Sequence, residues 1–158
     1  MNDSEELWDK RYSDNPVLNP PSEFLEEFEQ YLPNQGTCVD IAGGNGRNAL
    51  WFAKKGYTTS VIDISSVALN QAAKSAQSQE VELECIYWDI EKNLLPSERT
   101  WDIALLTLFL NRGVLQTTNE YLNPQGILLF AQPTKKNLER HQHPSANDSY
   151  STLQKYLR

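Results

Sequence analysis

A glycine-rich turn preceded by an acidic residue is the stretch of this sequence best suited to bind a ligand. Residues 40–49 read DIAGGNGRNA, with Asp40 directly before the turn. Two further aspartates, Asp63 and Asp89, each follow a run of residues that fits a β-strand. Glycine turns between a strand and a helix bring backbone N–H groups close to a ligand, and carboxylates beside them select its charge. Three ligand classes compete for this turn: a terminal phosphate, a dinucleotide and a methyl donor.

The residues after the last glycine exclude a phosphate-binding P-loop. That loop needs Gly-Lys-Ser/Thr, because the lysine and the hydroxyl hold the terminal phosphates and the magnesium ion. Here Gly46 is followed by Arg47 and Asn48. The dinucleotide fingerprint fits better, since Gly44-x-Gly46-x-x-Ala49 matches G-x-G-x-x-A and an aspartate follows at about the expected distance. Spacing alone leaves a dinucleotide open.

The charge of Asp40 favours the methyl donor. A pyrophosphate lies on a helix N-terminus, where a carboxylate at the neighbouring strand end would repel it. S-adenosyl-L-methionine has no phosphate, and its sulfonium and α-ammonium groups gain from a carboxylate in a partly desolvated pocket. Asp63 can then accept from both ribose hydroxyls, and Asp89 from the adenine amino group. S-adenosyl-L-methionine is therefore the predicted cofactor.

Alternating strand and helix patterns predict where these residues lie. Strands are expected at residues 37–42, 57–64, 81–88, 101–110 and 126–133. Helices are expected at residues 4–12, 22–32, 47–55, 66–76 and 111–122, with Ser4 and Ser22 as N-caps and an Asn-Pro-Gln-Gly turn after the last. This order predicts an α/β fold with a doubly wound, mostly parallel sheet of at least five strands and helices on both faces. Ligands on such a sheet bind beyond the carboxyl ends of the strands, where the glycine turn and the aspartates fall.

Composition indicates one globular domain and argues against a nucleic-acid or membrane partner. The 158 residues divide into an N-terminal helical cap at 1–33, a cofactor-binding core at 37–133 and a polar tail at 134–158. The formal net charge of -7 opposes binding to nucleic acid, and no apolar run approaches the length that crosses a bilayer. Cys38 and Cys85 lie in strand-like runs without Cys-x-x-Cys spacing, which predicts reduced thiols and a cytoplasmic location.

Two histidines in the tail have a spacing that metal ligands can use. His141 and His143 could bind one ion from a strand, but no third ligand has an identifiable position. A solvated loop is the preferred interpretation, and no metal site is predicted. Nothing in the sequence indicates the oligomeric state.

Five short motifs, in order, resemble those of the class I, Rossmann-like S-adenosylmethionine-dependent methyltransferases. They read VDIAGGNGRNALWFAKKGY, VIDIS, YWDIEKNLLP, WDIALLTLFLNR and LNPQGILLFAQP, and the resemblance runs from Trp8 to about Ser145. WDKRY and RNALWFAKKGY are most similar to the small-molecule branch that includes the tellurite-resistance and thiopurine methyltransferases. Ala42 stands where the family usually has its first glycine. Members usually continue into two more strands, which are expected to be missing or minimal here because few residues follow Pro133.

The resemblance implies a set of donor-binding residues and a position for the transferred methyl group. In chain order the residues are Arg11, Tyr12, Asp40, Ala42, Gly44, Gly46, Asp63, Ile64, Asp89, Ile90, Leu106 and Thr107. The glycine turn would line the methionine part of the donor, with Arg11 or Tyr12 near its carboxylate. Asp63 would hold the ribose, Asp89 the adenine, and Leu106 and Thr107 would lie beside the transferred methyl group.

Methyl transfer to a small-molecule acceptor is the predicted function. A soft S, Se or Te nucleophile needs little help from a base, and no residue is identified as a general base, which favours a soft or already ionised acceptor. Two alternatives stay open. One is a non-catalytic or truncated methyltransferase-like module that binds the donor, motivated by the short C-terminus. The other is an NAD(P)-dependent oxidoreductase, motivated by G-x-G-x-x-A alone.

Overall fold

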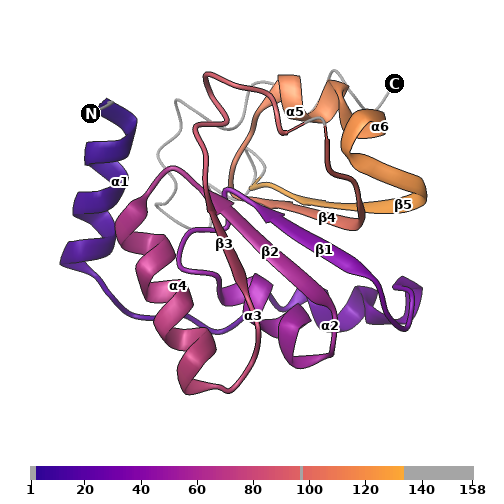
Figure 1. Ribbon diagram of the computed structural model, residues 1–158, viewed down its shortest axis with the longest axis horizontal. Coiled ribbons are helices and arrows are strands. Elements are labelled where there is room, and N and C mark those ends of the chain that lie inside the picture. Colours follow the sequence, from indigo (N-terminus) through magenta and orange to yellow (C-terminus); the bar gives the residue numbers. More distant parts are fainter. Residues whose placement is uncertain (1–2, 97, 134–158) are drawn as a thin grey trace.

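Helices precede the first strand, and strands and helices then follow one another in nearly the predicted order, with two strands in succession at residues 84–107 (Figure 1). The computed structural model describes residues 3–96 and 98–133. The helical elements are α1 (Asp3–Asp14), α2 (Phe24–Phe28), the 3₁₀ turn η1 (Glu29–Tyr31), α3 (Arg47–Lys54), α4 (Ser66–Ser78), α5 (Arg112–Gln116) and α6 (Thr118–Tyr121). The strands are β1 (Thr37–Ile41), β2 (Thr58–Asp63), β3 (Glu84–Tyr87), β4 (Trp101–Thr107) and β5 (Leu122–Ala131).

The described strands form one parallel sheet in the order β3-β2-β1-β4-β5. Every neighbouring pair is parallel; Val39 of β1, for example, lies opposite Ser60 of β2 and Ala104 of β4. The chain moves outward from β1 to β3 and then returns to the other side of β1 with β4. This topology confirms the predicted doubly wound α/β sheet. Its switch point lies between β1 and β4, which is where a sheet of this kind binds ligands.

Helices cover both faces of the sheet, because alternate side chains of each central strand point in opposite directions. On one face, Cys38 and Ile103 pack against Leu25 of α2 and Phe52 of α3. Helix α4 packs beside them in a neighbouring apolar cluster. On the other face, Ile41 belongs to a cluster that includes side chains of α5 and α6. Figure 1 shows these two layers below and above the strands.

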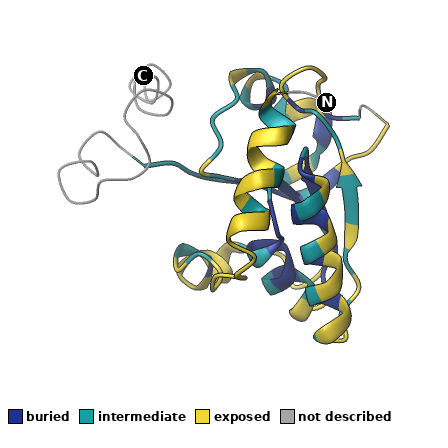
Figure 2. Ribbon diagram, turned by 90° about the vertical axis from the view of Figure 1, so that its left-hand side faces the viewer, coloured by how far each residue is buried: buried dark blue, intermediate teal, exposed yellow. Residues whose placement is uncertain are grey.

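Helix α1 lies outside these layers and is held mainly by polar contacts. It has no buried residue and packs on α4 (Figure 2). Asp9 Oδ1 accepts hydrogen bonds from the Ser65 hydroxyl at 2.6 Å and from the Val67 N–H at 3.2 Å. Gln71 Nε2 donates to the Tyr12 carbonyl at 2.8 Å. A carboxylate is favoured at a helix N-terminus, so Asp9 attaches α1 to the start of α4.

Both predicted serine caps are wrong. Ser4 lies inside α1, which begins at Asp3. Ser22 precedes the cap of α2, because Glu23 occupies that position without a capping side-chain hydrogen bond. The Ser22 N–H instead donates to Asn48 Oδ1 at 2.8 Å, which ties this segment to α3. The predicted helix at 22–32 is therefore shorter and divides into α2 and η1.

Two predicted strands are shorter than expected. The strand predicted at 81–88 is confined to β3, because β2 offers it partners only from Ser60 to Asp63. The strand predicted at 101–110 ends with β4, because Leu108 adopts a left-handed conformation with φ 57°. The chain leaves the sheet at this point and runs along the ligand side of the molecule.

The segment between β4 and β5 also departs from the prediction. The helix expected at 111–122 consists of the short helices α5 and α6, separated at Thr117. The Asn-Pro-Gln-Gly turn is wrong as a separate element, since these residues belong to β5. Gln125 has φ 66°, and the register between β4 and β5 shifts here, so the turn residues form an irregularity within the strand.

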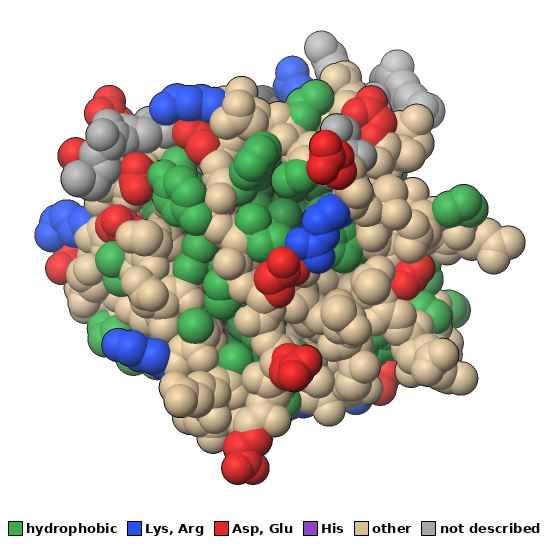
Figure 3. All heavy atoms as spheres, viewed as in Figure 1, with side chains coloured by type: hydrophobic (Ala, Val, Ile, Leu, Met, Phe, Trp, Pro, Cys, Tyr) green, Lys and Arg blue, Asp and Glu red, His purple; other side chains and the backbone are tan. Residues whose placement is uncertain are grey.

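The face of the molecule in Figure 3 carries scattered rather than segregated charge. On the face in Figure 3, Lys and Arg side chains lie singly among acidic and uncharged ones and form no continuous basic surface. No helix of the described residues is long and apolar enough to cross a membrane. The polar tail predicted at 134–158, with His141 and His143, lies outside the described residues.

Candidate functional site

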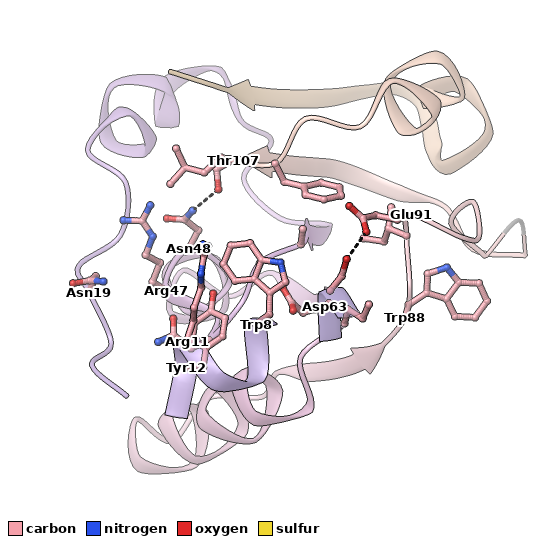
Figure 4. Close-up of a pocket in the computed structure, with 18 of the residues that line it drawn as sticks. Trp8, Arg11, Tyr12, Asn19, Arg47, Asn48, Asp63, Trp88, Glu91 and Thr107 are labelled. Atoms are coloured by element: carbon pink, nitrogen blue, oxygen red, sulfur yellow. Dashed lines mark hydrogen bonds between the residues drawn. The ribbon is translucent and has the colours of Figure 1, made fainter. Parts of the chain in front are cut away.

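A cavity of about 460 Å³ opens beyond the carboxyl ends of β1, β2 and β4 (Figure 4). Its walls come from α1, the glycine turn, the start of α3 and the segments that follow β2, β3 and β4. This is the position that the sheet topology predicts for a ligand. Residues far apart in the sequence therefore meet here, because parallel strands end at the same edge of the sheet.

Close packing and unusual backbone conformations restrict which residues the glycine turn can contain. The Gly43 N–H donates to the Ile62 carbonyl of β2 at 3.1 Å, which fixes the turn to the neighbouring strand. Gly44 has φ 57°, and a Cβ there would overlap the Tyr12 hydroxyl, so any larger residue would displace the Tyr12 side chain. Ala42, where the family usually has glycine, adopts φ 55°, a conformation that costs an L-residue about 1 kcal/mol.

Asp63 faces the cavity and also holds the turn together. Its Oδ2 accepts from the Gly44 N–H at 2.8 Å, and its Oδ1 accepts from the Ser65 N–H at 2.8 Å. The residue is 7% exposed, and burial raises its pKa despite these hydrogen bonds. Each carboxylate oxygen has a second lone pair, so Asp63 can also accept from a ligand hydroxyl. The predicted ribose contact and a structural role in the turn are both compatible with this geometry.

Asp40 lies beneath the glycine turn rather than in the cavity wall. Its side chain is fully buried, and neither oxygen accepts a hydrogen bond from the part of the chain that the structure describes. A Cβ at Gly43 would lie 2.6 Å from Asp40 Cγ, so the carboxyl group packs directly against the backbone of the turn. Burial raises the pKa of Asp40 to about 7. The Ala49 N–H, which lies nearby without hydrogen-bond geometry, and the Arg47 guanidinium oppose this shift.

Helix α1 supplies one wall of the cavity. The Arg11 guanidinium carbon lies 4.7 Å from the centroid of the Trp8 ring, a cation–π contact. Burial and the charges of nearby carboxylates raise the pKa of Tyr12 to about 12. Ser4 Oγ donates to Glu91 Oε2 at 3.0 Å, which connects α1 with the segment after β3 (Figure 4). Tyr12 is therefore a neutral hydrogen-bond donor at physiological pH.

The segment after β3 contributes Asp89 and Ile90. Asp89 Oδ1 accepts from the Glu91 N–H at 3.1 Å and from the Lys92 N–H at 3.2 Å. The Lys92 ammonium lies 3.4 Å from Asp89 Oδ2. Asp89 and Ile90 both line the cavity, and Ile90 also belongs to the apolar core. Asp89 thus stabilises a turn and faces the ligand side, as Asp63 does.

The opposite end of the cavity is formed by the start of α3 and the end of β4. Asn48 connects three segments, since its Nδ2 donates to Thr107 Oγ1 at 3.2 Å and its Oδ1 accepts from the Ser22 N–H. The half-buried Arg47 donates from Nη1 to the Pro20 carbonyl at 3.2 Å. Figure 4 shows Arg47, Asn48 and Thr107 grouped at this end.

Most of the residues predicted to bind the donor line the cavity. They are Arg11, Tyr12, Ala42, Asp63, Ile64, Asp89, Ile90 and Thr107. Asp40, Gly44, Gly46 and Leu106 do not line it. Gly46 precedes α3 with φ 78° and faces α4, and Leu106 is fully buried in the core because its side chain points to the sheet face that packs on α5 and α6.

Several lining residues were missed by the sequence analysis. Arg47 and Asn48 stand directly after the glycine turn, so their place at the start of a helix was an available signal. Trp88 and Glu91 flank the predicted pair Asp89 and Ile90. No cluster of three His, Cys, Asp or Glu among residues 3–96 and 98–133 has the arrangement of a metal site.

Comparison with known proteins identifies a family and a curated relative. A family model described as a methyltransferase domain matches residues 16–154. The tRNA 5-carboxymethoxyuridine methyltransferase of Escherichia coli strain K12 is 26% identical over 128 residues, covering 75% of this chain and 48% of the relative. The chain therefore spans about half the length of that relative.

Solved structures share the fold. A methyltransferase from Thiobacillus denitrificans, in complex with S-adenosyl-L-homocysteine, superposes with a TM-score of 0.61 at 21% identity, covering 78% of this chain and 54% of that one. TehB from Haemophilus influenzae superposes with a TM-score of 0.60 at 19% identity, covering 84% of this chain and 47% of TehB. At these identities the likeness establishes the fold alone.

Proposed function

Because the chain belongs to the methyltransferase domain family, we propose that it transfers a methyl group from S-adenosyl-L-methionine to a small-molecule acceptor. When bound, this donor supplies a carbon activated by its sulfonium leaving group, so that transfer forms a bond to the acceptor, breaks the carbon–sulfur bond and leaves S-adenosyl-L-homocysteine. The task of the protein is to hold both ligands in line and to exclude water.

The proposal rests mainly on the environment of the Asp40 carboxyl group. It is buried without a hydrogen-bond partner, directly beneath the glycine turn. A cationic ligand on the other side of the turn would stabilise its charged form, and the sulfonium and ammonium groups of the donor supply that charge. A pyrophosphate would instead meet Asp40 and the carboxylates of the cavity wall, Asp63, Asp89 and Glu91. This electrostatic difference favours the methyl donor over NAD(P).

The donor-binding roles follow from the walls of the cavity. Asp63 would accept from the ribose hydroxyls with its remaining lone pairs, and Asp89 from the adenine amino group, with Ile90 against the ring. Arg11 or Tyr12 would lie near the donor's carboxylate. The backbone of the glycine turn would contact the methionine part, while the buried Asp40 acts through its charge. Gly46 and Leu106 would act indirectly, by shaping the start of α3 and the end of β4.

An acceptor that arrives already ionised fits the site best. Histidine and lysine do not occur in the described cavity wall, and the raised pKa of Tyr12 keeps its hydroxyl protonated. A soft thiolate, selenide or telluride needs no base, and we propose this acceptor class and the tellurite-resistance or thiopurine-type branch. The curated relative acts on tRNA. For this chain, the net charge of -7 and the scattered cations in Figure 3 favour a small molecule.

Calorimetric titration and acceptor assays test the proposal. S-adenosyl-L-methionine and S-adenosyl-L-homocysteine are expected to bind and to raise the melting temperature, whereas NAD and NADP leave it unchanged. No binding of either sulfur ligand contradicts the proposal. Donor binding without turnover of any thiol, selenide, telluride, selenite, tellurite or tRNA substrate indicates a binding module instead. Turnover of tRNA alone contradicts the small-molecule assignment.

A cytoplasmic location stays a prediction, based on the free thiols of Cys38 and Cys85.

A further inference from the structure

A second cavity, of about 360 Å³, adjoins the first at the Arg47 end. Arg47, Thr107 and Leu108 line both cavities, so the two spaces meet at the end of β4. Phe24 and Pro133 contribute apolar surface to the second cavity. A ligand could therefore occupy the second cavity and present one end to the first.

Arg47 is a half-buried cation that forms no ion pair within 4 Å in the described part of the chain, although its charge is felt by the buried Asp40. None of the ion pairs formed by residues 3–96 and 98–133 includes it. Its only described hydrogen bond is the one from Nη1 to the Pro20 carbonyl. A guanidinium has five N–H donors in a planar fork, so one hydrogen bond leaves four of them unpaired within the described residues. A partly desolvated charge of this kind is stabilised by an anion.

Gln132 adds an unpaired amide to the same cavity. Its Nε2 and Oε1 atoms are both buried, and neither has a hydrogen-bond partner among residues 3–96 and 98–133. An unpaired buried polar atom is unfavourable, so a ligand that pairs with it binds more tightly. The backbone places Gln132 beside the junction of the cavities, because the Leu108 N–H donates to the carbonyl of the preceding Ala131 at 3.0 Å.

We propose that the second cavity binds a carboxylate of the methyl acceptor, with the Arg47 guanidinium and the Gln132 Nε2 as donors. One planar guanidinium and one amide match the two oxygens of a carboxylate, whereas a phosphate dianion would call for more than one cation. The apolar walls accommodate the body of the ligand, and its nucleophile lies toward Thr107. The site thereby selects acceptors that carry both a soft nucleophile and a carboxylate. This inference rests on the proposed function.

Binding is tested first, without turnover. The full chain is saturated with S-adenosyl-L-homocysteine and titrated with benzoate or with benzamide, which have the same shape but differ in charge. Benzoate is expected to bind at least 10-fold more tightly. Arg47→Gln is expected to remove this preference, Arg47→Lys to retain part of it, and Gln132→Leu to reduce it several-fold. Lys74→Gln, in the exposed part of α4, removes the same charge outside both cavity walls and should leave the preference intact.

Turnover is tested with 4-mercaptobenzoate and 4-mercaptobenzamide, followed by mass spectrometry of the S-methyl products. The ratio of kcat/KM for acid over amide is expected to be at least 10 in the natural chain and about 1 in Arg47→Gln. Equal binding of benzoate and benzamide overturns the inference, as does a preference that survives Arg47→Gln. A preference for benzoate with no methylation of either thiol supports the carboxylate site and contradicts the proposed function.

The affinity for S-adenosyl-L-homocysteine separates this site from the donor site. It is expected to change far less in Arg47→Gln than the benzoate preference does, because Arg47 affects the donor site only through its electrostatic effect on the buried Asp40. A loss of 10-fold or more assigns Arg47 to the carboxylate of the donor and overturns the inference. A benzoate preference that is absent from the full chain but appears after removal of residues 134–158 also overturns it, because the tail would then occupy the second cavity.

Discussion

The two ends of the ligand cavity satisfy their polar groups in different ways. At the end formed by β2 and β3, the carboxylates of Asp63 and Asp89 already accept backbone N–H groups. At the end formed by α3 and β5, Arg47 forms no ion pair within residues 3–96 and 98–133, and the Gln132 amide has no partner. The first end is organised by the fold itself, whereas the second needs a ligand to complete its hydrogen bonds. Asp40 is the exception, an unpaired group beneath the organised end.

The largest expected effect comes from Asp40, whose pKa is raised by burial from 3.8 to about 7. The folded state therefore binds a proton more tightly than the unfolded state, and the free energy of unfolding falls as pH rises from about 4 to 7. The loss approaches about 4 kcal/mol at pH 8, which Asp40→Asn should recover. Urea denaturation between pH 5 and 8 measures it.

Donor binding should reverse this pH dependence. Because a cationic donor favours the ionised carboxylate, its affinity is expected to rise between pH 6 and 8 in the natural chain and to stay flat in Asp40→Asn. Asp102→Asn is the contrasting control, because hydrogen bonds from Thr37 and Asn123 lower the pKa of Asp102. The contribution of the Asp102 carboxylate to the free energy of unfolding should be lost as pH falls toward 4 and below. An affinity in Asp40→Asn that still rises with pH would exclude Asp40 as the titrating group.

Asp63→Ala is the next largest change, because it removes a ligand contact and two hydrogen bonds of the turn. We expect about 100-fold weaker binding of the donor, which corresponds to about 2.7 kcal/mol, and about 2 kcal/mol less stability. Asp102→Ala is the matched control, since Asp102 accepts from the Thr37 N–H at 2.7 Å at the amino ends of β4 and β1, whereas the cavity lies at the carboxyl ends. A similar loss of stability without loss of donor affinity is expected there. Equal donor affinity in both variants would contradict the ribose role of Asp63.

Asn48→Ala tests the hydrogen bonds that connect the chain segments at the second end. The variant leaves the Ser22 N–H and the Thr107 hydroxyl without a partner, so we expect about 1–2 kcal/mol less stability in urea denaturation. Asn45→Ala is a suitable comparison, because Asn45 Nδ2 makes a single contact, at 3.2 Å, to the Val17 carbonyl. A smaller loss is expected there. If the two variants lose equal stability, Asn48 does not connect the three segments as described.

Gln132→Leu should have the smallest effect on stability, and of the opposite sign. Because the amide is buried without partners, an apolar side chain of similar size is expected to be neutral or to stabilise the free protein by up to about 1 kcal/mol. Thermal unfolding without ligand measures this. A loss comparable to that of Asn48→Ala would mean that the amide is paired in solution, and the contrast between the two ends would disappear.

Much of the donor end could be predicted from the sequence because local patterns encode it. The glycine turn and the aspartates that follow β2 and β3 have fixed spacing from strand-like runs, and parallel strands bring such positions to one edge. Leu106 shows where this reasoning is limited. It lies near the predicted strand end, but its neighbour Thr107 faces the cavity, because side chains alternate along a strand and the sequence did not specify which face carries the ligand.

The second end, formed by α3 and β5, was largely missed by the sequence analysis, because it depends on contacts between distant segments. Arg47 and Asn48 adjoin the glycine turn, yet their partners Pro20 and Thr107 come from other parts of the chain. Gln132 carries no local signal at all. Its importance follows from the absence of a partner, which only the packing of β5 against the end of β4 reveals.

The sequence by itself determined the parallel α/β sheet, the glycine turn and the carboxylates around it, because strand and helix periods and glycine spacing are local properties. The tertiary structure alone decided which polar groups are paired. Tyr12 packs against Gly44, Asp40 is sealed beneath the turn without a partner, and Arg47 faces a second cavity. Each of these follows from burial by segments remote in sequence, and burial sets both the cost of an unpaired charge and the ligand that can relieve it.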